Sequence, residues 1–282
     1  MLCALGLLAA VAVLTIHGAV TDGSRPTGAS ARPSATSGPS PSAGSASTLV
    51  DPTRVRLEQP GFVSWALLDR RTGGVVGAAN LAERSDTMSM VKPWLVADYL
   101  THTDPDPDAK TLAMLRTMIV DSDNAAATKV FGLNGGIVTI ERMVSVCGLP
   151  DSAPNYRENR WSPTIVTARD TVLLGQCLAS GRAAGPRWTG WLLKQMREVR
   201  GEGDFGARSA FGEPLRSAIA IKNGWFMRPE DQQWHLACLA IGDDWIVSVL
   251  QRYPRALGFT YGKRVCRQVA VQLGLPSLTS SR

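Results

Sequence analysis

The order of apolar patterns along the chain predicts a mixed α/β (α+β) fold, in which an antiparallel sheet is built from both termini. Two observations support this fold class. Short β-prone runs stand near both ends of the chain after residue 50, and helical apolar spacing fills the middle. A composition of 44% hydrophobic and 19% charged residues is enough to bury a sizeable core. We therefore expect helices to flank the sheet and an all-helical region to be inserted between its first and last strands.

The first 48 residues are expected to direct export rather than to join this core. Residues 1–20 are almost continuously apolar, which is typical of a secretion signal sequence or a membrane anchor. Residues 21–48 contain only Ser, Thr, Gly, Ala and Pro apart from one aspartate and two arginines, a composition that predicts a disordered linker. The folded domain is expected over residues 49–282, outside the cytoplasm, either membrane-anchored or secreted.

The first elements of the domain are predicted from β-prone runs and a helical pattern. Residues 61–68 and 74–79 form a hairpin through the turn-like stretch DRRTG. An apolar helix follows at residues 89–100. Residues 108–182 keep helical spacing, with breaks at GLNGG and at the long irregular stretch GLPDSAPNYRENRWSPT.

The last third of the chain returns to strands. They are expected at residues 217–221, 233–241 and 245–251, the last two joined by GDD. A helix at residues 261–273 closes the chain. The strands at the two ends can then meet in one antiparallel sheet.

Four cysteines in an exported domain suggest disulfides. Cys147, Cys177, Cys238 and Cys266 allow three pairings. We expect Cys147 to pair with Cys177 and Cys238 with Cys266, because each pair falls within one half of the fold. Free buried thiols are the alternative.

Charge and histidine content argue against several functional classes. The net charge is +6, but the basic residues form neither a run nor a stripe with aromatic residues, so no nucleic-acid partner is expected. The three histidines are scattered, and no Cys/His cluster has metal-ligand spacing. We expect no Ser-His-Asp triad, no metal and no organic cofactor.

Ser89 and Lys92 stand three residues apart at the start of the first predicted helix, in DTMSMVKPWLV. At this spacing the two side chains share one helix face, so the amine can reach the hydroxyl. The unpaired N–H groups of the first helical turn can bind a developing oxyanion. Apolar neighbours favour the neutral form of Lys92, which makes it a candidate base for Ser89.

Two further motifs follow in a meaningful order. Ser122-Asp123-Asn124 lies in VDSDNAAA, and Lys222-Asn223-Gly224 lies on a late predicted strand. Together with Ser-x-x-Lys, they make the chain resemble the class A β-lactamase-like branch of the penicillin-recognising serine enzymes over residues 54–275. Asp123 itself is expected only to cap or anchor its turn.

This resemblance assigns catalytic roles. It implies that Ser89 is the acylated nucleophile and Lys92 its base. Ser122 relays a proton to the leaving nitrogen, while Asn124 holds the substrate amide and orients Lys92. A β-lactam or a peptidoglycan peptide would then be the substrate.

The resemblance also implies a substrate-binding strand. Lys222 supplies positive charge near Ser122 and the substrate carboxylate, and Gly224 completes the motif. The backbone N–H groups of Ser89 and of a residue just past the strand motif, most simply Trp225, would form the oxyanion hole. Asn223 replaces the family's usual threonine, so an amide rather than a hydroxyl would donate to the substrate carboxylate.

One departure concerns release of the acyl group. The family activates a hydrolytic water with a glutamate, commonly within Arg-Trp-Glu-Pro, whereas this chain has Arg160-Trp161-Ser162-Pro163. Ser162 then matches the glutamate position, and a hydroxyl cannot serve as that base. Glu158 lies four residues earlier and is expected to be a solvent-exposed loop carboxylate. We therefore expect slow release of the acyl group.

The sequence thus indicates an exported serine hydrolase that forms an acyl-enzyme with β-lactams or related amides. We expect a monomer that associates with the membrane through its N-terminal segment. One alternative is a peptidoglycan D,D-carboxypeptidase or transpeptidase that uses the same acylation. Another is a non-catalytic cell-wall-binding module that keeps the pocket.

Overall fold

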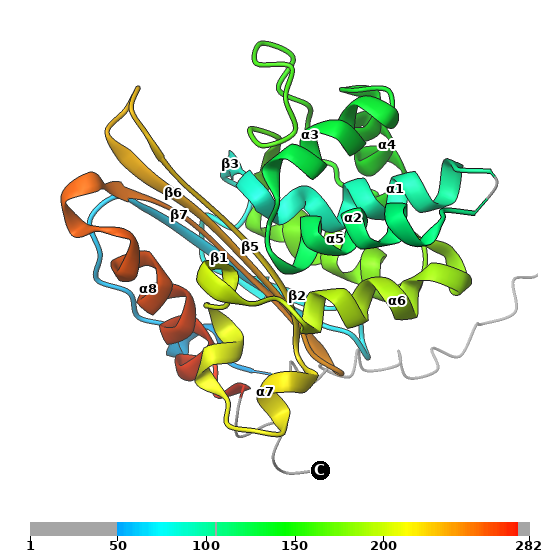
Figure 1. Ribbon diagram of the computed structural model, residues 1–282. Helices are drawn as coiled ribbons and strands as arrows, with labels where there is room; N and C mark the ends of the chain where they lie inside the picture. Colours follow the sequence, from blue (N-terminus) through cyan, green and yellow to red (C-terminus); the bar gives the residue numbers. More distant parts are fainter. Residues whose placement is uncertain (1–49, 105, 276–282) are drawn as a thin grey trace, which may run out of the picture. The chain divides into compact units, whose positions relative to one another are not determined.

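A five-stranded antiparallel sheet forms the centre of the fold (Figure 1). The computed structural model describes residues 50–104 and 106–275, so the expected signal or anchor and the linker lie outside the described residues. Every neighbouring pair of strands in this sheet is antiparallel. In spatial order the strands are β2 (Val75–Gly77), β1 (Phe62–Asp69), β7 (Trp245–Pro254), β6 (Gln233–Ile241) and β5 (Ala220–Arg228).

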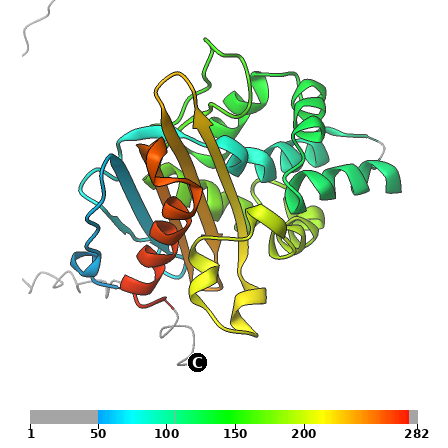
Figure 2. The same ribbon diagram turned by 60° about the vertical axis from the view of Figure 1, so that its left-hand side comes forward.

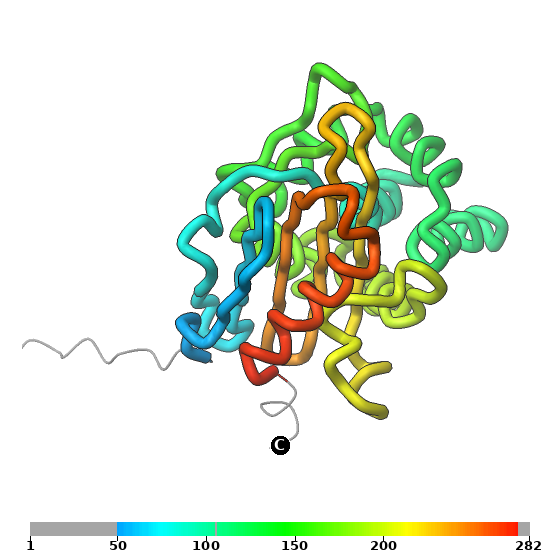
Figure 3. The backbone as a smooth tube through the Cα atoms, turned by 90° about the vertical axis from the view of Figure 1, so that its left-hand side faces the viewer, coloured from blue at the N-terminus to red at the C-terminus, as the bar shows by residue number. Residues whose placement is uncertain are grey.

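The pairing of β1 with β7 joins the two ends of the domain. All eight residues of β1 have partners on β7, from Phe62 opposite Arg252 to Asp69 opposite Trp245. Helix α8 (Phe259–Gln272) then crosses the outer face of the strands, as Figures 2 and 3 show. The predicted hairpin, the sheet built from both termini and the closing helix are confirmed.

The opposite face of the sheet is covered by the inserted helical region (Figure 1). Helix α1 lies at its centre and packs against the five helices around it. Most of α1 is buried. The six helices are α1 (Lys92–His102), α2 (Ala109–Val120), α3 (Asn124–Leu133), α4 (Val138–Cys147), α5 (Ala168–Ser180) and α6 (Gly185–Arg197).

Side-chain caps fix where three of these helices begin. Asp108, Asp123 and Thr167 each accept a hydrogen bond from a backbone N–H in the first turn of α2, α3 and α5. The prediction that Asp123 caps its turn is confirmed. Within the described ranges no single helix is long and apolar enough to cross a membrane; α3 and α4 meet that test only as a pair bent by 84°.

A second, two-stranded sheet lies within the inserted region, which is therefore not all-helical. Strand β3 (Arg84–Asp86) pairs with β4 (Ile165–Thr167). This pairing ties the segment before Ser89 to the end of the long loop between α4 and β4. The sequence analysis predicted neither strand, nor did it predict α6.

Two predicted elements begin differently in the structure. Residues 217–218 belong to helix α7 (Leu215–Ala218), and strand β5 starts only at Ala220. Ser217 donates through its hydroxyl to Pro214 O and through its N–H to Glu213, which holds a helical turn in place of the expected strand. The predicted helix at 89–100 begins as a 3-10 turn, η2 (Met88–Val91), before α1.

Both predicted disulfides are present. Cys147–Cys177 links α4 to α5, with an S–S distance of 2.09 Å. Cys238–Cys266 links β6 to α8 at the same S–S distance. The second bridge holds helix α8 on the sheet, and it starts from β6, the strand next to the one that carries Lys222.

Candidate active site

Ser89 lies in the 3-10 turn η2, where the chain passes from β3 into α1. Its neighbour Met88 has φ +45°, a left-handed conformation that is unusual for a side chain of this kind. Thr87 fixes the turn, because its N–H donates to Thr164 O at 3.0 Å and its hydroxyl donates to Ser162 O at 3.3 Å. The nucleophile candidate is therefore held by the end of the long loop.

Gly224 brings strand β5 directly against this turn. A Cβ atom built on Gly224 would lie 2.5 Å from both Ser89 N and Thr87 O. Such distances are possible only for glycine. The next residue, Trp225, lines the cavity described below. Its role as the second oxyanion donor stays a prediction.

Lys92 is completely buried at the first position of α1. Its Nζ donates to Ser122 O at 2.6 Å, to Asn124 Oδ1 at 2.8 Å and to Ser122 Oγ at 3.2 Å. Burial lowers the pKa of Lys92 to about 7, although the nearby Asp123 carboxylate acts in the opposite direction. A substantial fraction of Lys92 is thus neutral near physiological pH.

The Ser122 hydroxyl lies between two amines. Lys222 Nζ donates to Ser122 Oγ at 2.8 Å, and Lys92 Nζ donates to the same oxygen at 3.2 Å. Burial and the charge of Lys92 hold the pKa of Lys222 well below its usual range. Ser122 also has φ +59°, so its backbone is strained at the point where its hydroxyl meets the amines. This arrangement can pass a proton through the hydroxyl.

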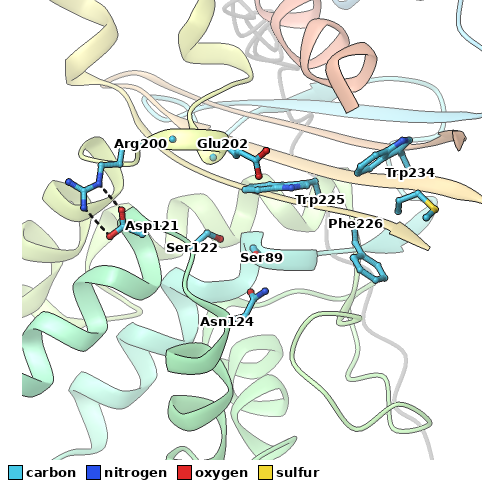
Figure 4. A pocket seen from close by; sticks show the side chains of 12 residues that line it. Ser89, Asp121, Ser122, Asn124, Arg200, Glu202, Trp225, Phe226 and Trp234 are labelled. Carbon is cyan, nitrogen blue, oxygen red and sulfur yellow. Dashed lines mark hydrogen bonds and ion pairs between the residues drawn. The ribbon is translucent and has the colours of Figure 1, made fainter. Parts of the chain in front are cut away.

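These side chains open onto a cavity of about 690 Å³ (Figure 4). Ser89 and Ser122 lie beside Asn124 on its floor, and Trp225 forms part of the opposite wall. No residue of the loop 148–164 lines this cavity. The lining residues are Ser89, Asp121, Ser122, Asn124, Arg200, Gly201, Glu202, Gly203, Trp225, Phe226, Met227 and Trp234.

Asp121, Arg200 and Trp234, which were not predicted from the sequence, complete the cavity wall beside the predicted Trp225. Asp121 is paired with Arg200, whose Nε donates to Asp121 Oδ1 at 2.6 Å. Trp225 and Trp234 each stack on Phe259 at 5.4 Å between ring centroids. No sequence motif contains Asp121, Arg200 or Trp234, because the fold gathers them from separate elements.

Asn223 does not point into this cavity. Its side chain is buried, and its Nδ2 donates to Phe205 O at 2.8 Å and to Gly203 O at 3.0 Å. Both amide hydrogens are therefore used to hold the loop before β5. The expected donation from Asn223 to a substrate carboxylate would require these bonds to break.

The long loop supplies Trp161, not an acid, to the neighbourhood of Lys92. The centroid of the Trp161 ring lies 4.9 Å from Lys92 Nζ. Trp161 is 9% exposed, and its Nε1 donates to Thr128 Oγ1 at 3.3 Å. The sequence analysis assigned no role to Trp161, although it stands beside Ser162 in the matched stretch.

The Glu158 carboxylate is engaged by two arginines and does not line the cavity. It forms ion pairs with Arg160 and, at 3.3 Å, with Arg228 on β5. Burial raises the pKa of Glu158, but hydrogen bonds from Arg160 and Arg228 outweigh this and lower it overall. A carboxylate held by two arginines is a poor candidate for the base of a hydrolytic water.

Solved β-lactamases share this architecture. A β-lactamase from Xanthomonas campestris pv. campestris superposes with a TM-score of 0.61 and 17% identity, over 78% of this chain and 93% of that chain. The class A β-lactamase from Mycobacterium abscessus superposes with a TM-score of 0.58 and 16% identity, over 78% and 95%. Identities this low establish the fold alone, and the fold of this chain is β-lactamase-like.

The proteins that are similar to this chain in sequence are named as lipoproteins and not as β-lactamases. Proteins named "Putative lipoprotein LppW" in Mycobacterium tuberculosis and Mycobacterium bovis are 27% identical to this chain over 209 residues. The match covers 68% of this chain, and the chain spans 65% of the length of these relatives. No family model matches the chain.

Proposed function

We propose that this protein is an exported serine hydrolase that forms an acyl-enzyme at Ser89 with β-lactams or related amides. The observation that carries the proposal is the position of the Ser122 hydroxyl between Lys92 and Lys222, on the floor of the cavity that also holds Ser89. The β-lactamase-like fold supports the same class of substrate. The two disulfides and the lipoprotein name of the relatives support an extracytoplasmic, membrane-anchored location.

Acylation follows from the roles proposed for these groups. Ser89 Oγ attacks the carbonyl carbon and gives its proton to neutral Lys92. N–H groups of Ser89 and Trp225 stabilise the oxyanion. The carbon–nitrogen bond then breaks, and the leaving nitrogen takes the proton of the Ser122 hydroxyl. Ser122 regains a proton from the adjacent amines.

Release of the acyl group by water is proposed to be slow. Two acids line the cavity: Asp121, which is paired with Arg200, and Glu202. Glu158 is held by arginines, and Ser162 cannot act as a general base. A well-placed base is worth about 10² to 10⁴ in rate. Because neither Glu158 nor Ser162 supplies one from the loop, we expect a persistent ester.

Labelling with a fluorescent penicillin tests the acylation. The domain from about residue 50 should carry the label on a denaturing gel, and Ser89→Ala should abolish it. Ser180→Ala, at the far end of α5, is the matched control and should label normally. Labelling that survives in Ser89→Ala would overturn the assignment.

Intact-mass spectrometry tests the slow release. The penicillin adduct should remain visible for minutes after mixing, and Glu158→Gln should change its lifetime little. Rapid turnover by the wild type that is lost in Glu158→Gln would instead establish Glu158 as a working base.

The same acylation would serve a peptidoglycan D,D-carboxypeptidase or transpeptidase, and a persistent ester fits these enzymes as well. A non-catalytic cell-wall-binding module would give no covalent adduct with any penicillin. The labelling experiment therefore separates the binding module from both enzymes.

A further inference from the structure

Trp161 is the residue through which the long loop reaches the catalytic lysine. Its ring centroid is 4.9 Å from Lys92 Nζ, and Lys92 has no exposed surface. The three hydrogen bonds of Lys92 point toward Ser122 and Asn124. The indole therefore covers a part of the amine that would otherwise be hydrated.

The surrounding structure holds this ring in place. The Trp161 Nε1 donates to Thr128 Oγ1 on α3, and Thr164 N donates to Trp161 O. The following residue, Ser162, accepts a hydrogen bond from Thr87 in the turn that carries Ser89. The ring is thus anchored to α3, which carries Asn124, and the adjacent loop backbone is anchored to the turn that carries Ser89.

We propose that Trp161 is a positioning residue that keeps water away from Lys92 and from the loop side of the ester on Ser89. This inference rests on the proposed acylation of Ser89, and it gives a physical reason for slow release. The loop contributes no residue to the cavity lining, and Trp161 is only 9% exposed. In this proposal, water reaches the ester from the open cavity and not from the loop side.

Hydrolysis needs a water molecule beside a proton acceptor. The oxygen of that water must attack the ester carbonyl while its proton passes to a base; the bond from carbon to Ser89 Oγ then breaks, and Ser89 Oγ takes a proton from that base. Lys92 is a candidate for this base, but the Trp161 ring lies against it, with the ring centroid 4.9 Å from Nζ. The charged groups that face Lys92 from other elements are Lys222 on β5 and Asp123 at the start of α3.

Two substitutions of Trp161 test this role. Trp161→Ala removes the ring and opens space for water, whereas Trp161→Phe keeps an aromatic ring and loses only the hydrogen bond to Thr128. Trp188→Ala, on α6 outside the cavity lining, is the control. Trp161→Gln, which keeps more volume and admits water as a partner, replaces Trp161→Ala if that variant does not fold.

The first measurement is the lifetime of the penicillin adduct by intact-mass spectrometry. We expect Trp161→Ala to shorten it by roughly tenfold or more, and Trp161→Phe and Trp188→Ala to leave it near the wild-type value. Unchanged lifetimes in both Trp161→Ala and Trp161→Gln would overturn the inference.

The second measurement is independent of any acyl group. NMR titration of protein with labelled lysine should show that Trp161→Ala raises the pKa of Lys92 by one unit or more, because water then solvates the ammonium. An unchanged pKa would show that the ring does not exclude water. If no penicillin labels the wild type, the proposed acylation fails, and this titration still decides whether Trp161 shields Lys92.

Discussion

At the scale of single residues, the environment of Lys92 decides when Ser89 can react. An amine buried without a paired carboxylate loses its proton more easily than an exposed one, and burial lowers the pKa of Lys92 to about 7. Asn124 and Ser122 supply only polar oxygen atoms to it. The lysine can therefore act as a base at neutral pH without a histidine.

This environment predicts the pH dependence of acylation. Because only neutral Lys92 accepts the proton of Ser89, the acylation rate should rise with pH through about 7 and level off above it. Stopped-flow or quenched labelling with a fluorescent penicillin between pH 5 and 9 measures this profile. Lys92→Arg, which stays protonated, should label poorly at every pH. A flat profile would contradict a lysine base.

Gly224 gives a second prediction at this scale. In Gly224→Ala the new Cβ would meet Ser89 N and Thr87 O at 2.5 Å, and both are backbone atoms that cannot rotate away. Displacement of the nucleophile turn should lower the labelling rate by about 10² or more. Gly190→Ala on α6, where nothing lies within 4 Å of the added Cβ, is the control and should label normally.

At the scale of elements, the sequence correctly predicted a strand at the Lys222 motif but wrongly predicted that the strand begins at residue 217. The sequence placed the Lys222 motif on a late strand, and β5 carries it, although the strand extends to Arg228 and not only to residue 221 as predicted. The preceding residues form α7, because hydrogen bonds from Ser217 to Glu213 and Pro214 hold a helical turn. Local contacts of this kind leave no periodic pattern in a stretch of four residues.

The loop before β4 shows a similar limit. Matching by sequence drew attention to Ser162, but the side chain that packs beside Lys92 is that of Trp161. In an irregular loop, the side chains have no helical or strand periodicity. The sequence therefore cannot predict whether Trp161 or the adjacent Ser162 faces inward. The motif residues Ser89, Lys92, Ser122 and Lys222 could be predicted because their spacing is tied to regular elements.

Asn223 connects the motif strand to the loop before it, and this gives a prediction at the scale of elements. Asn223→Thr, which introduces the residue usual in the motif, can keep at most one of the two donations to Gly203 and Phe205. A buried carbonyl then loses its partner, at a cost of about 1 to 3 kcal/mol in the free energy of unfolding. Urea denaturation measures this loss, and an equal or greater stability of Asn223→Thr would contradict it.

At the scale of the whole molecule, the fold was predictable because its order is simple. Strands at the two ends of the domain can pair the backbone N–H and C=O groups of their edges by meeting in one sheet. Strands β1 and β7 do so along the full length of β1. Each predicted disulfide joined elements within one half of the fold, and both are present. Trp225 was predicted because it directly follows the strand motif, but Arg200 and Trp234 were not, because they reach the cavity wall only through tertiary packing.

The two disulfides should contribute similarly to stability but differently to activity. They close 30 and 28 residues of chain, and removal of either by paired Cys→Ala substitution should cost about 3 to 4 kcal/mol in the free energy of unfolding. Cys238 lies opposite Asn223 on the neighbouring strand, and a Cβ built on Gly206 would lie 3.6 Å from Cys238 Sγ and 3.5 Å from Asn223 Oδ1. This bridge therefore packs against the loop that Asn223 holds at the cavity wall. Cys147–Cys177 lies between α4 and α5 and supports no cavity residue directly.

We therefore expect both double variants to unfold at lower urea concentration by similar amounts, when each is measured without reductant. Under native conditions Cys238→Ala/Cys266→Ala should also label more slowly with a fluorescent penicillin. The reason is that Gly206, which follows the cavity-lining residues 201–203, loses the disulfide against which it packs. Cys147→Ala/Cys177→Ala should label at the wild-type rate and is the matched control. Equal labelling rates in the two double variants would show that the bridge behind β5 stabilises the fold without supporting the cavity.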